Sequence, residues 1–217
     1  LKEAGYKVFA PTRKEFPVED IIGVSEYLAD EKRFDCILHC AAWTDVKGAE
    51  KAKNKEKVIE VNIYGCMNMR VAAKWQPRKT KIIYISTDYV YDGMEGGYTL
   101  KSKPNPGTFY GWSKLAGEAY MTPTDLIIRT SFCKRETWGP TKKHLQAVFK
   151  DIHTTKDWVD IIAPKIVKAL KRKGIIHIAT KRKTLESLAI EDYPGVSVIS
   201  HKDVRLGYNY PVDCSLN

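Results

Sequence analysis

The sequence has no apolar run long enough to cross a membrane, and it is poor in cysteine. No stretch approaches the roughly 18 apolar residues that a membrane span needs, and no secretory leader precedes the first apolar segment. We therefore expect a cytoplasmic protein with no membrane partner. The five cysteines lie mostly in apolar runs, as reduced core thiols do, and no second cysteine pair accompanies Cys36 and Cys40. No metal site is expected.

Acidic residues are the minority among the charges. The 217 residues include 26 Asp and Glu against 36 Lys and Arg, giving a formal charge of +10, with much of the excess in 47–57, 165–173 and 181–183. These stretches carry no zinc-finger, helix-turn-helix or RNA-binding aromatic motif, so no nucleic-acid partner is expected. Solvated helix faces are the first interpretation of the excess, and attraction of an anionic nucleotide is the second.

The hydrophobic pattern alternates between strand-like and helix-like spacing. Strands are predicted at 6–10, 35–42, 81–86, 126–130, 174–179 and 196–199. Helices are predicted at 19–32, 58–75, 113–121, 159–170 and 184–190, after a helix end at 1–5. This order favours an α/β fold with a doubly wound parallel sheet and helices on both faces. Because such sheets bind ligands beyond the carboxyl ends of their strands, functional residues should follow the strands.

A tyrosine and a lysine form the first candidate site. Tyr110 and Lys114 stand four residues apart in a predicted helix, so their side chains share one face. A nearby ammonium favours the phenolate and should lower the pKa of Tyr110 from its usual value of about 10. Such a pair suits proton transfer to a carbonyl oxygen while hydride reaches the carbon. Spacing alone is a weak signal, since a surface tyrosine beside a surface lysine would produce it too.

Thr87 gives the pair a context. It directly follows the predicted strand 81–86, within the run Ser86-Thr87-Asp88-Tyr89. A hydroxyl at this place can hydrogen-bond the same substrate oxygen that Tyr110 would protonate. Gly117, in the segment after Lys114, would allow close helix packing.

These segments resemble the extended short-chain dehydrogenase/reductases that act on nucleotide sugars, and most of all the dTDP-4-dehydrorhamnose reductase family. Ala41-Ala42-Trp43-Thr44-Asp45-Val46 is similar to that family's Ala-Ala-Tyr-Thr-x-Val segment. Asn62, Gly65 and Asn68 match its helix pattern, and 210–217 resembles its closing Arg-Pro-x-x-x-Ser-Leu-Asp. The resemblance is strongest over 35–129.

The resemblance implies a Rossmann-like fold with an NAD(P)-binding domain at 1–132 and a smaller substrate-binding lobe at 133–217, interleaved with it. It also implies a catalytic trio: Tyr110 protonates the keto oxygen of the sugar, Thr87 hydrogen-bonds that oxygen, and Lys114 holds the nicotinamide ribose. Further cofactor contacts are implied for Arg13, Cys40, Ala41, Ala42, Thr44 and Arg129. Substrate contacts are implied for Val46, Asp88, Tyr89 and Ser131.

The expected cofactor is NADPH, with NADH as the alternative. Arg13 follows the predicted strand 6–10, where a basic residue meets the 2′-phosphate of NADP in related folds, and no acidic residue occupies that strand tip. The sequence has no Gly-x-x-Gly-x-x-Gly loop to approach the diphosphate. By the family's pattern we expect the chain to lack a first strand with that loop and a final helix. A form that restores the strand and loop should bind cofactor far better.

Three functions stay open at this stage. The first is reduction of a 4-keto-6-deoxy sugar nucleotide, in deoxysugar or polysaccharide precursor synthesis. The second is epimerase or dehydratase activity on the same fold, although Tyr89 stands where dehydratases carry the Glu of Thr-Asp-Glu. The third is a non-catalytic NADP-binding regulatory subunit. A homodimer is the expected assembly, because dimers are the commonest among soluble oligomers.

Overall fold

The structure, a computed structural model, describes residues 1–29, 34–76, 79–135, 147–204 and 211–217. Tyr210, which opens the closing segment of the resemblance, lies outside the described residues. The helices are η1 (Lys2–Ala4), α1 (Ile21–Ala29), α2 (Val46–Ala49), α3 (Ala52–Ile59), η2 (Glu60–Tyr64), α4 (Gly65–Lys74), η3 (Asp88–Val90), α5 (Phe109–Glu118), α6 (Val159–Ala169), α7 (Leu185–Ile190) and η5 (His201–Asp203). The strands are β1 (Cys36–His39), β2 (Lys81–Ile85), β3 (Leu126–Thr130), β4 (Phe132–Cys133), β5 (Ala147–Phe149), β6 (His153–Thr154), β7 (Asp157–Trp158), β8 (Gly174–Ile178), β9 (Lys183–Thr184) and β10 (Ser197–Ile199).

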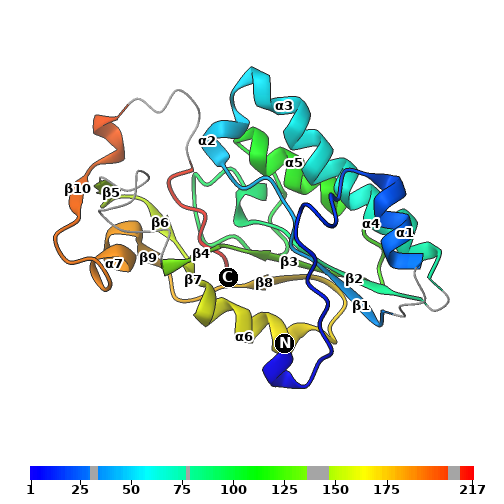
Figure 1. Ribbon diagram of the computed structural model, residues 1–217. Helices are drawn as coiled ribbons and strands as arrows, with labels where there is room; N and C mark the ends of the chain where they lie inside the picture. Colours follow the sequence, from blue (N-terminus) through cyan, green and yellow to red (C-terminus); the bar gives the residue numbers. More distant parts are fainter. Residues whose placement is uncertain (30–33, 77–78, 136–146, 205–210) are drawn as a thin grey trace.

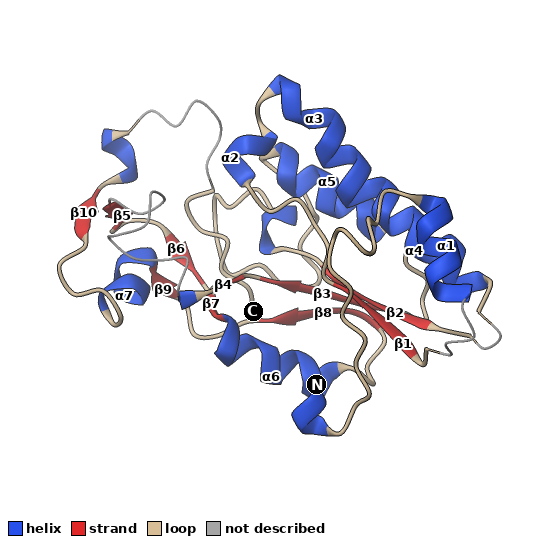
Figure 2. Cartoon of the chain, viewed as in Figure 1, coloured by secondary structure: helices blue, strands red, loops and turns tan. Residues whose placement is uncertain are grey.

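The predicted doubly wound parallel sheet is confirmed. Four strands are hydrogen-bonded in the order β1-β2-β3-β8, and every pair is parallel. Figure 1 shows α3, α4 and α5 over one face of this sheet and α6 under the other. Figure 2 shows the four strands running side by side between these helical layers. The carboxyl ends of the strands therefore meet at one edge, where residues following β1, β2 and β3 come together.

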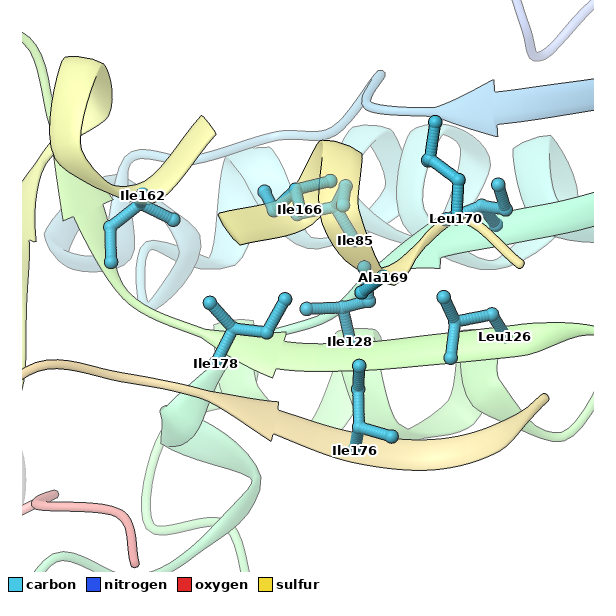
Figure 3. Packing of buried hydrophobic residues seen from close by; sticks show 10 residues of the cluster. Ile85, Leu126, Ile128, Ile162, Ile166, Ala169, Leu170, Ile176 and Ile178 are labelled. Carbon is cyan, nitrogen blue, oxygen red and sulfur yellow. The ribbon is translucent and has the colours of Figure 1, made fainter. Parts of the chain in front are cut away.

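Isoleucine and leucine side chains attach α6 to the sheet. Ile162 and Ile166 of α6 pack on strand residues including Ile128 and Ile176, all of them buried (Figure 3). The opposite face of the sheet is covered by a second cluster, in which Met69 of α4 and Val24 of α1 lie with Ile82. A sheet buried on both faces explains why its strands read as unbroken apolar runs.

The helix predicted at 58–75 begins earlier and is not uniform. Helical structure starts at Ala52 and continues through α3 to α4, with the π-helical segment η2 between them. A π-helical turn accommodates one extra residue, which turns side chains of the following segment relative to those before it. The predicted helix at 113–121 likewise begins at Phe109, because the Thr108 hydroxyl caps it there.

The strand predicted at 6–10 is wrong. In the described residues this segment pairs with no strand, Tyr6 and Phe9 are exposed, and β1 is the edge of the sheet. A cavity of about 670 Å³ is lined both by 6–11 and by β1. An extended segment becomes a strand only when a neighbour supplies hydrogen bonds, and in the described residues β1 pairs with β2 and not with this segment. The segment 6–10 therefore has the apolar pattern of a strand, but no described strand pairs with it.

The C-terminal part of the chain is divided between the main sheet and small two-stranded pairs. Strand β8 extends the main sheet, while β5 pairs with β10, β4 with β7, and β6 with β9. The closing segment returns to the region after β2, where the N–H groups of Val212 and Asp213 donate to the Gly93 carbonyl at 2.9 and 2.7 Å. Among the described residues, no helix is both long enough and apolar enough to span a membrane.

Candidate active site

The hydroxyls of Thr87 and Tyr110 come together where β2 ends and α5 begins. Thr108 caps α5 by accepting the Gly111 N–H at 3.0 Å, which places Tyr110 in the first turn. Thr87 caps η3 by accepting the Tyr89 N–H at 3.2 Å. The Thr87 hydroxyl lies close enough to the Tyr110 phenol to lower the pKa of Tyr110, and it donates to Oδ1 of Asp88 at 3.1 Å. The structure therefore unites two residues that lie 23 positions apart in the sequence.

Close backbone packing holds η3 against α5. A Cβ atom placed on Gly111 would lie 2.1 Å from the Tyr89 carbonyl oxygen, far inside contact distance. The rings of Tyr89 and Tyr110 meet edge to face, with centroids 6.1 Å apart. Gly117 allows a second close approach, since a Cβ there would lie 2.6 Å from the Tyr84 hydroxyl. The prediction of close packing at Gly117 agrees with this geometry.

The pKa of Tyr110 moves in the opposite direction from that predicted. Burial above all raises the pKa of Tyr110 to about 12; the neighbouring Thr87 hydroxyl opposes that shift, and the Asp88 carboxyl adds a smaller contribution to it. The Lys114 ammonium lies over the ring of Tyr84, 4.1 Å from its centroid. The spacing correctly predicted that the two residues share one helix. It did not predict the direction in which the Lys114 ammonium points. Tyr110 consequently keeps its proton at neutral pH, as a proton donor must.

Lys114 titrates close to neutrality. Burial lowers its pKa to about 8, although the neighbouring Cys66, Glu118 and Cys40 oppose that shift. The side chain is almost fully buried, at 3% exposure. Its ammonium is thus held by the Tyr84 ring and by nearby acidic groups rather than by water. A lysine with this pKa can change its charge within the physiological range.

His39 is a site residue that sequence reasoning missed. It ends β1, stacks on Tyr84 with ring centroids 5.5 Å apart, and is 3% exposed. Burial, and secondarily the charge of Lys114, lower its pKa to about 3, so the imidazole is neutral. Its Nε2 is buried without a hydrogen-bond partner in the described structure. The signal was a histidine inside the apolar run 35–42, at the end of its strand.

Most of the residues predicted to hold the cofactor at the N-terminal side of the sheet line one cavity, but not all of them do. Arg13, Cys40, Ala41 and Ala42 line the 670 Å³ cavity, as His39 does. Thr44 is exposed, and it is not among the residues that line this cavity. Arg13 is exposed too, and its guanidinium forms an ion pair with Glu19 at 3.1 Å.

Arg129, also predicted at the cofactor, is buried in an ion pair. Its Nη2 lies 2.7 Å from Oε2 of Glu118, and its Nε donates to Oε1 at 3.1 Å. The remaining nitrogen, Nη1, donates to the Tyr91 hydroxyl at 2.8 Å. With 4% of its surface exposed, Arg129 presents its charge to protein groups. Its predicted place at the nicotinamide remains a prediction.

Two of the residues predicted to touch substrate lie beside Tyr110, and a third lies near Asp88. The Asp88 carboxyl raises the pKa of Tyr110, the ring of Tyr89 meets the Tyr110 ring, and Ser131 lowers the pKa of Asp88. Val46 begins α2, a short helix that packs against α5. Asp45 caps α2 by accepting the Gly48 N–H at 2.9 Å.

Asp88 predicts a measurable pH dependence of stability. Burial raises its pKa to about 6, although Lys156, Thr87 and Ser131 oppose that shift. The folded state thus favours the protonated carboxyl. The protonated Asp88 carboxyl stabilises the fold fully below about pH 4, the pKa of an aspartate in the unfolded chain. This stability is lost as pH rises through 6. At pH 8 the free energy of unfolding of Asp88→Asn should exceed that of the wild type by roughly 2 kcal/mol, so the variant should unfold at higher urea. At pH 4.5 the difference should be smaller.

Chemical unfolding at both pH values measures this difference. Asp35→Asn is the matched control, because Asp35 is exposed and its replacement should shift both curves little. An Asp88→Asn difference that stays constant between the two pH values would contradict the raised pKa.

Comparison with known proteins places this site in a family. The profile described as the RmlD substrate binding domain matches residues 1–166. The chain belongs to this family. Over 145 residues it is 36% identical to a probable low-salt glycan biosynthesis reductase of Haloferax volcanii, covering 61% of this chain and 47% of that protein. Over 137 residues it is 34% identical to dTDP-4-dehydrorhamnose reductase of Mycobacterium tuberculosis, covering 59% and 42%.

A solved structure shows the same fold over the whole chain. The dTDP-4-dehydrorhamnose reductase of Bacillus anthracis, in complex with NADP, superposes with a TM-score of 0.84 at 24% identity and covers 100% of this chain and 83% of that one. The matched regions span less than half the length of the two curated relatives. Membership in the RmlD family and the Rossmann-like fold therefore agree with the resemblance drawn from 35–129.

Proposed function

We propose that the protein reduces a keto group on the sugar of a nucleotide sugar, with NADPH as the electron donor. The neighbouring hydroxyls of Thr87 and Tyr110, with Lys114 one turn further along α5, carry this proposal. The names of the two relatives from Haloferax volcanii and Mycobacterium tuberculosis, both reductases, support it. The substrate we propose is a dTDP-linked 4-keto-6-deoxy sugar, following the name of the mycobacterial relative.

Tyr110 is the proton donor in this proposal. Its pKa of about 12 keeps the phenol protonated at neutral pH, so the proton is available when negative charge develops on the keto oxygen. The Thr87 hydroxyl lies beside the phenol, and in this proposal it hydrogen-bonds the same keto oxygen. Lys114, with a pKa near 8, supplies positive charge close to the same helix turn. These groups supply the proton, and the bound cofactor supplies the hydride.

The described residues fit part of a dinucleotide site. Arg13 offers a cation at the cavity, and the small side chains of Ala41 and Ala42 allow a ligand to approach the backbone there. The unpaired Nε2 of His39 adds a buried polar group that a ligand or water can satisfy. We propose that these residues meet NADPH, and that Lys114 contacts its ribose. The sequence contains no Gly-x-x-Gly-x-x-Gly loop to add a diphosphate cradle.

The proposal favours reduction over elimination of water. Dehydratases of this fold place an acid after Thr-Asp, whereas this chain has Tyr89 there, with its ring against Tyr110. Asp88 is the remaining carboxyl beside Thr87, and its pKa near 6 leaves it partly protonated in the physiological range. We propose that Asp88, Tyr89 and Ser131 border the sugar.

A spectrophotometric assay tests the proposal. NADPH and dTDP-4-keto-6-deoxy-mannose are supplied to the chain, and to a fusion in which the first strand and glycine loop of a matched reductase precede Leu1. We expect consumption of NADPH with formation of the reduced sugar, faster in the fusion. The second arm replaces NADPH with NADH, and a lower rate is expected because Arg13 favours a 2′-phosphate.

Each other outcome identifies a different function. Sugar isomers without net NADPH consumption would indicate an epimerase. Tight NADPH binding by calorimetry without turnover of the sugar would indicate a binding subunit. No binding and no turnover, in both the chain and the fusion, would refute the reductase proposal.

A further inference from the structure

Glu118 joins three elements of the site at its buried carboxylate. It lies at the end of α5, one turn beyond Lys114, with 6% of its side chain exposed. Oε1 accepts the Ser86 hydroxyl at 2.5 Å, and both oxygens accept the guanidinium of Arg129. Ser86 directly precedes Thr87, and Arg129 lies in β3. One carboxylate therefore ties α5 to the carboxyl ends of β2 and β3.

We propose that Glu118 is a positioning residue for the reaction: it holds α5, and with it Tyr110 and Lys114, against the strand end that carries Thr87. This inference rests on the proposed reductase function, since it concerns the same catalytic trio. Arg129 then supports the site through its ion pair with Glu118.

The bond network explains how this contact acts at a distance. Tyr110 lies two turns before Glu118 on the same helix, and a rigid helix transmits the position of one end to the other. At the first turn, α5 is held by Gly111 against Tyr89. At the last turn, Glu118 holds it to Ser86 through a charge-assisted hydrogen bond. Fixing both ends fixes the approach of Tyr110 to Thr87.

The charge of Glu118 has a second effect, on Lys114. The groups that face this lysine are Tyr84 on β2, Cys66 on α4, His39 and Cys40 at the end of β1, and Glu118 on its own helix. Burial lowers the pKa of Lys114, and Glu118 is the one carboxylate among the groups that raise it. Glu118 thus keeps Lys114 charged near neutral pH.

Groups on the far side of Glu118 complete the environment. Arg129 pairs with it, Tyr91 bonds Arg129, and His177 of β8 lies 2.9 Å from the Tyr91 hydroxyl. Burial, and secondarily the charge of Arg129, lower the pKa of His177, although its bond with Asn217 opposes this. His177 is consequently neutral in the range where Lys114 titrates, and Glu118 is the group on this side that shifts the pKa of Lys114.

Nitrogen NMR of the Lys114 side chain tests the inference without requiring turnover. The signal is assigned by its loss in Lys114→Arg, and its titration is followed in the wild type and in Glu118→Gln. Glutamine preserves the shape and the acceptor for Ser86 but removes the charge. We expect the pKa of Lys114 to fall by about one pH unit, and the alkaline limb of kcat/KM to move toward lower pH by the same amount.

A matched buried carboxylate serves as the control. Asp125 is 1% exposed, pairs with Arg70, and accepts the Ile82 N–H at 2.8 Å at the opposite end of the strands. Asp125→Asn should lower stability comparably while leaving the Lys114 titration unchanged. If Glu118→Gln fails to fold because Arg129 is left unpaired, Glu118→Met with Arg129→Met removes both charges. The pKa of Lys114 should fall there too, because Glu118 raises that pKa and Arg129 is not among the groups that shift it.

The outcomes separate this inference from the proposed function. A Lys114 titration that is the same in wild type and the Glu118 variants, or that falls equally in Asp125→Asn, would overturn the role of Glu118 even if turnover is intact. A fall confined to the Glu118 variants supports that role even if the wild type reduces no sugar. In that event the failed assay refutes the reductase function alone.

Discussion

Replacing Tyr110 with phenylalanine is expected to lower kcat for ketone reduction by about 10²- to 10⁴-fold, the usual contribution of a positioned proton donor. The substitution removes only the hydroxyl that lies beside Thr87. The ring contact with Tyr89, at 6.1 Å between centroids, can persist, so the melting temperature should change little. Steady-state rates at saturating NADPH measure the loss, and calorimetry should show nearly unchanged NADPH affinity.

Tyr64→Phe is the matched control for this result. Tyr64 is 48% exposed at the end of the π-helical segment, on a different element from Thr87 and Tyr110. Its replacement removes the same atom and should leave kcat at the wild-type level. Comparable rates in Tyr110→Phe and Tyr64→Phe would show that another group protonates the sugar.

The sequence was a good guide to where the catalytic groups lie along the chain. Tyr110 and Lys114 share α5, and Thr87 follows β2, because strand ends and helix periodicity are local properties. The direction of the Tyr110 pKa shift was not local. It depends on burial by residues far away in sequence, and on the aromatic face of Tyr84 under Lys114.

Partners that are distant in sequence also explain the other differences. The segment 6–10 has the composition of a strand, yet it has no neighbour with which to pair. Arg129 follows the family pattern, but its partner Glu118 lies 11 residues earlier on another element. The i to i+4 spacing of Lys114 and Glu118 was visible in the sequence. The burial of Glu118 was not visible in the sequence, because it depends on how α5 packs on β2 and β3.

Adding one methyl group at Gly111 should disrupt the site almost as strongly as removing the Tyr110 hydroxyl. In Gly111→Ala the new Cβ would lie 2.1 Å from the Tyr89 carbonyl oxygen, and a backbone atom cannot rotate away as a side chain can. Helix α5 must therefore move away from η3, which separates Tyr110 from Thr87. We expect overpacking to cost about 1–3 kcal/mol, and a displacement of about 1 Å to lower kcat by roughly 10²-fold.

Gly23→Ala shows whether this loss comes from the position of α5. Both glycines lie inside helices, where alanine is otherwise favoured by about 1 kcal/mol. At Gly23 the new Cβ would meet Oδ2 of Asp20 at 2.7 Å, the end of an exposed side chain that can turn aside. Gly23→Ala should therefore retain both stability and turnover, as measured by urea unfolding and by the NADPH assay. Wild-type turnover in Gly111→Ala would mean that α5 can move without separating the two hydroxyls. Such a result would count against the fixed approach of Tyr110 to Thr87 on which the proposed proton transfer depends.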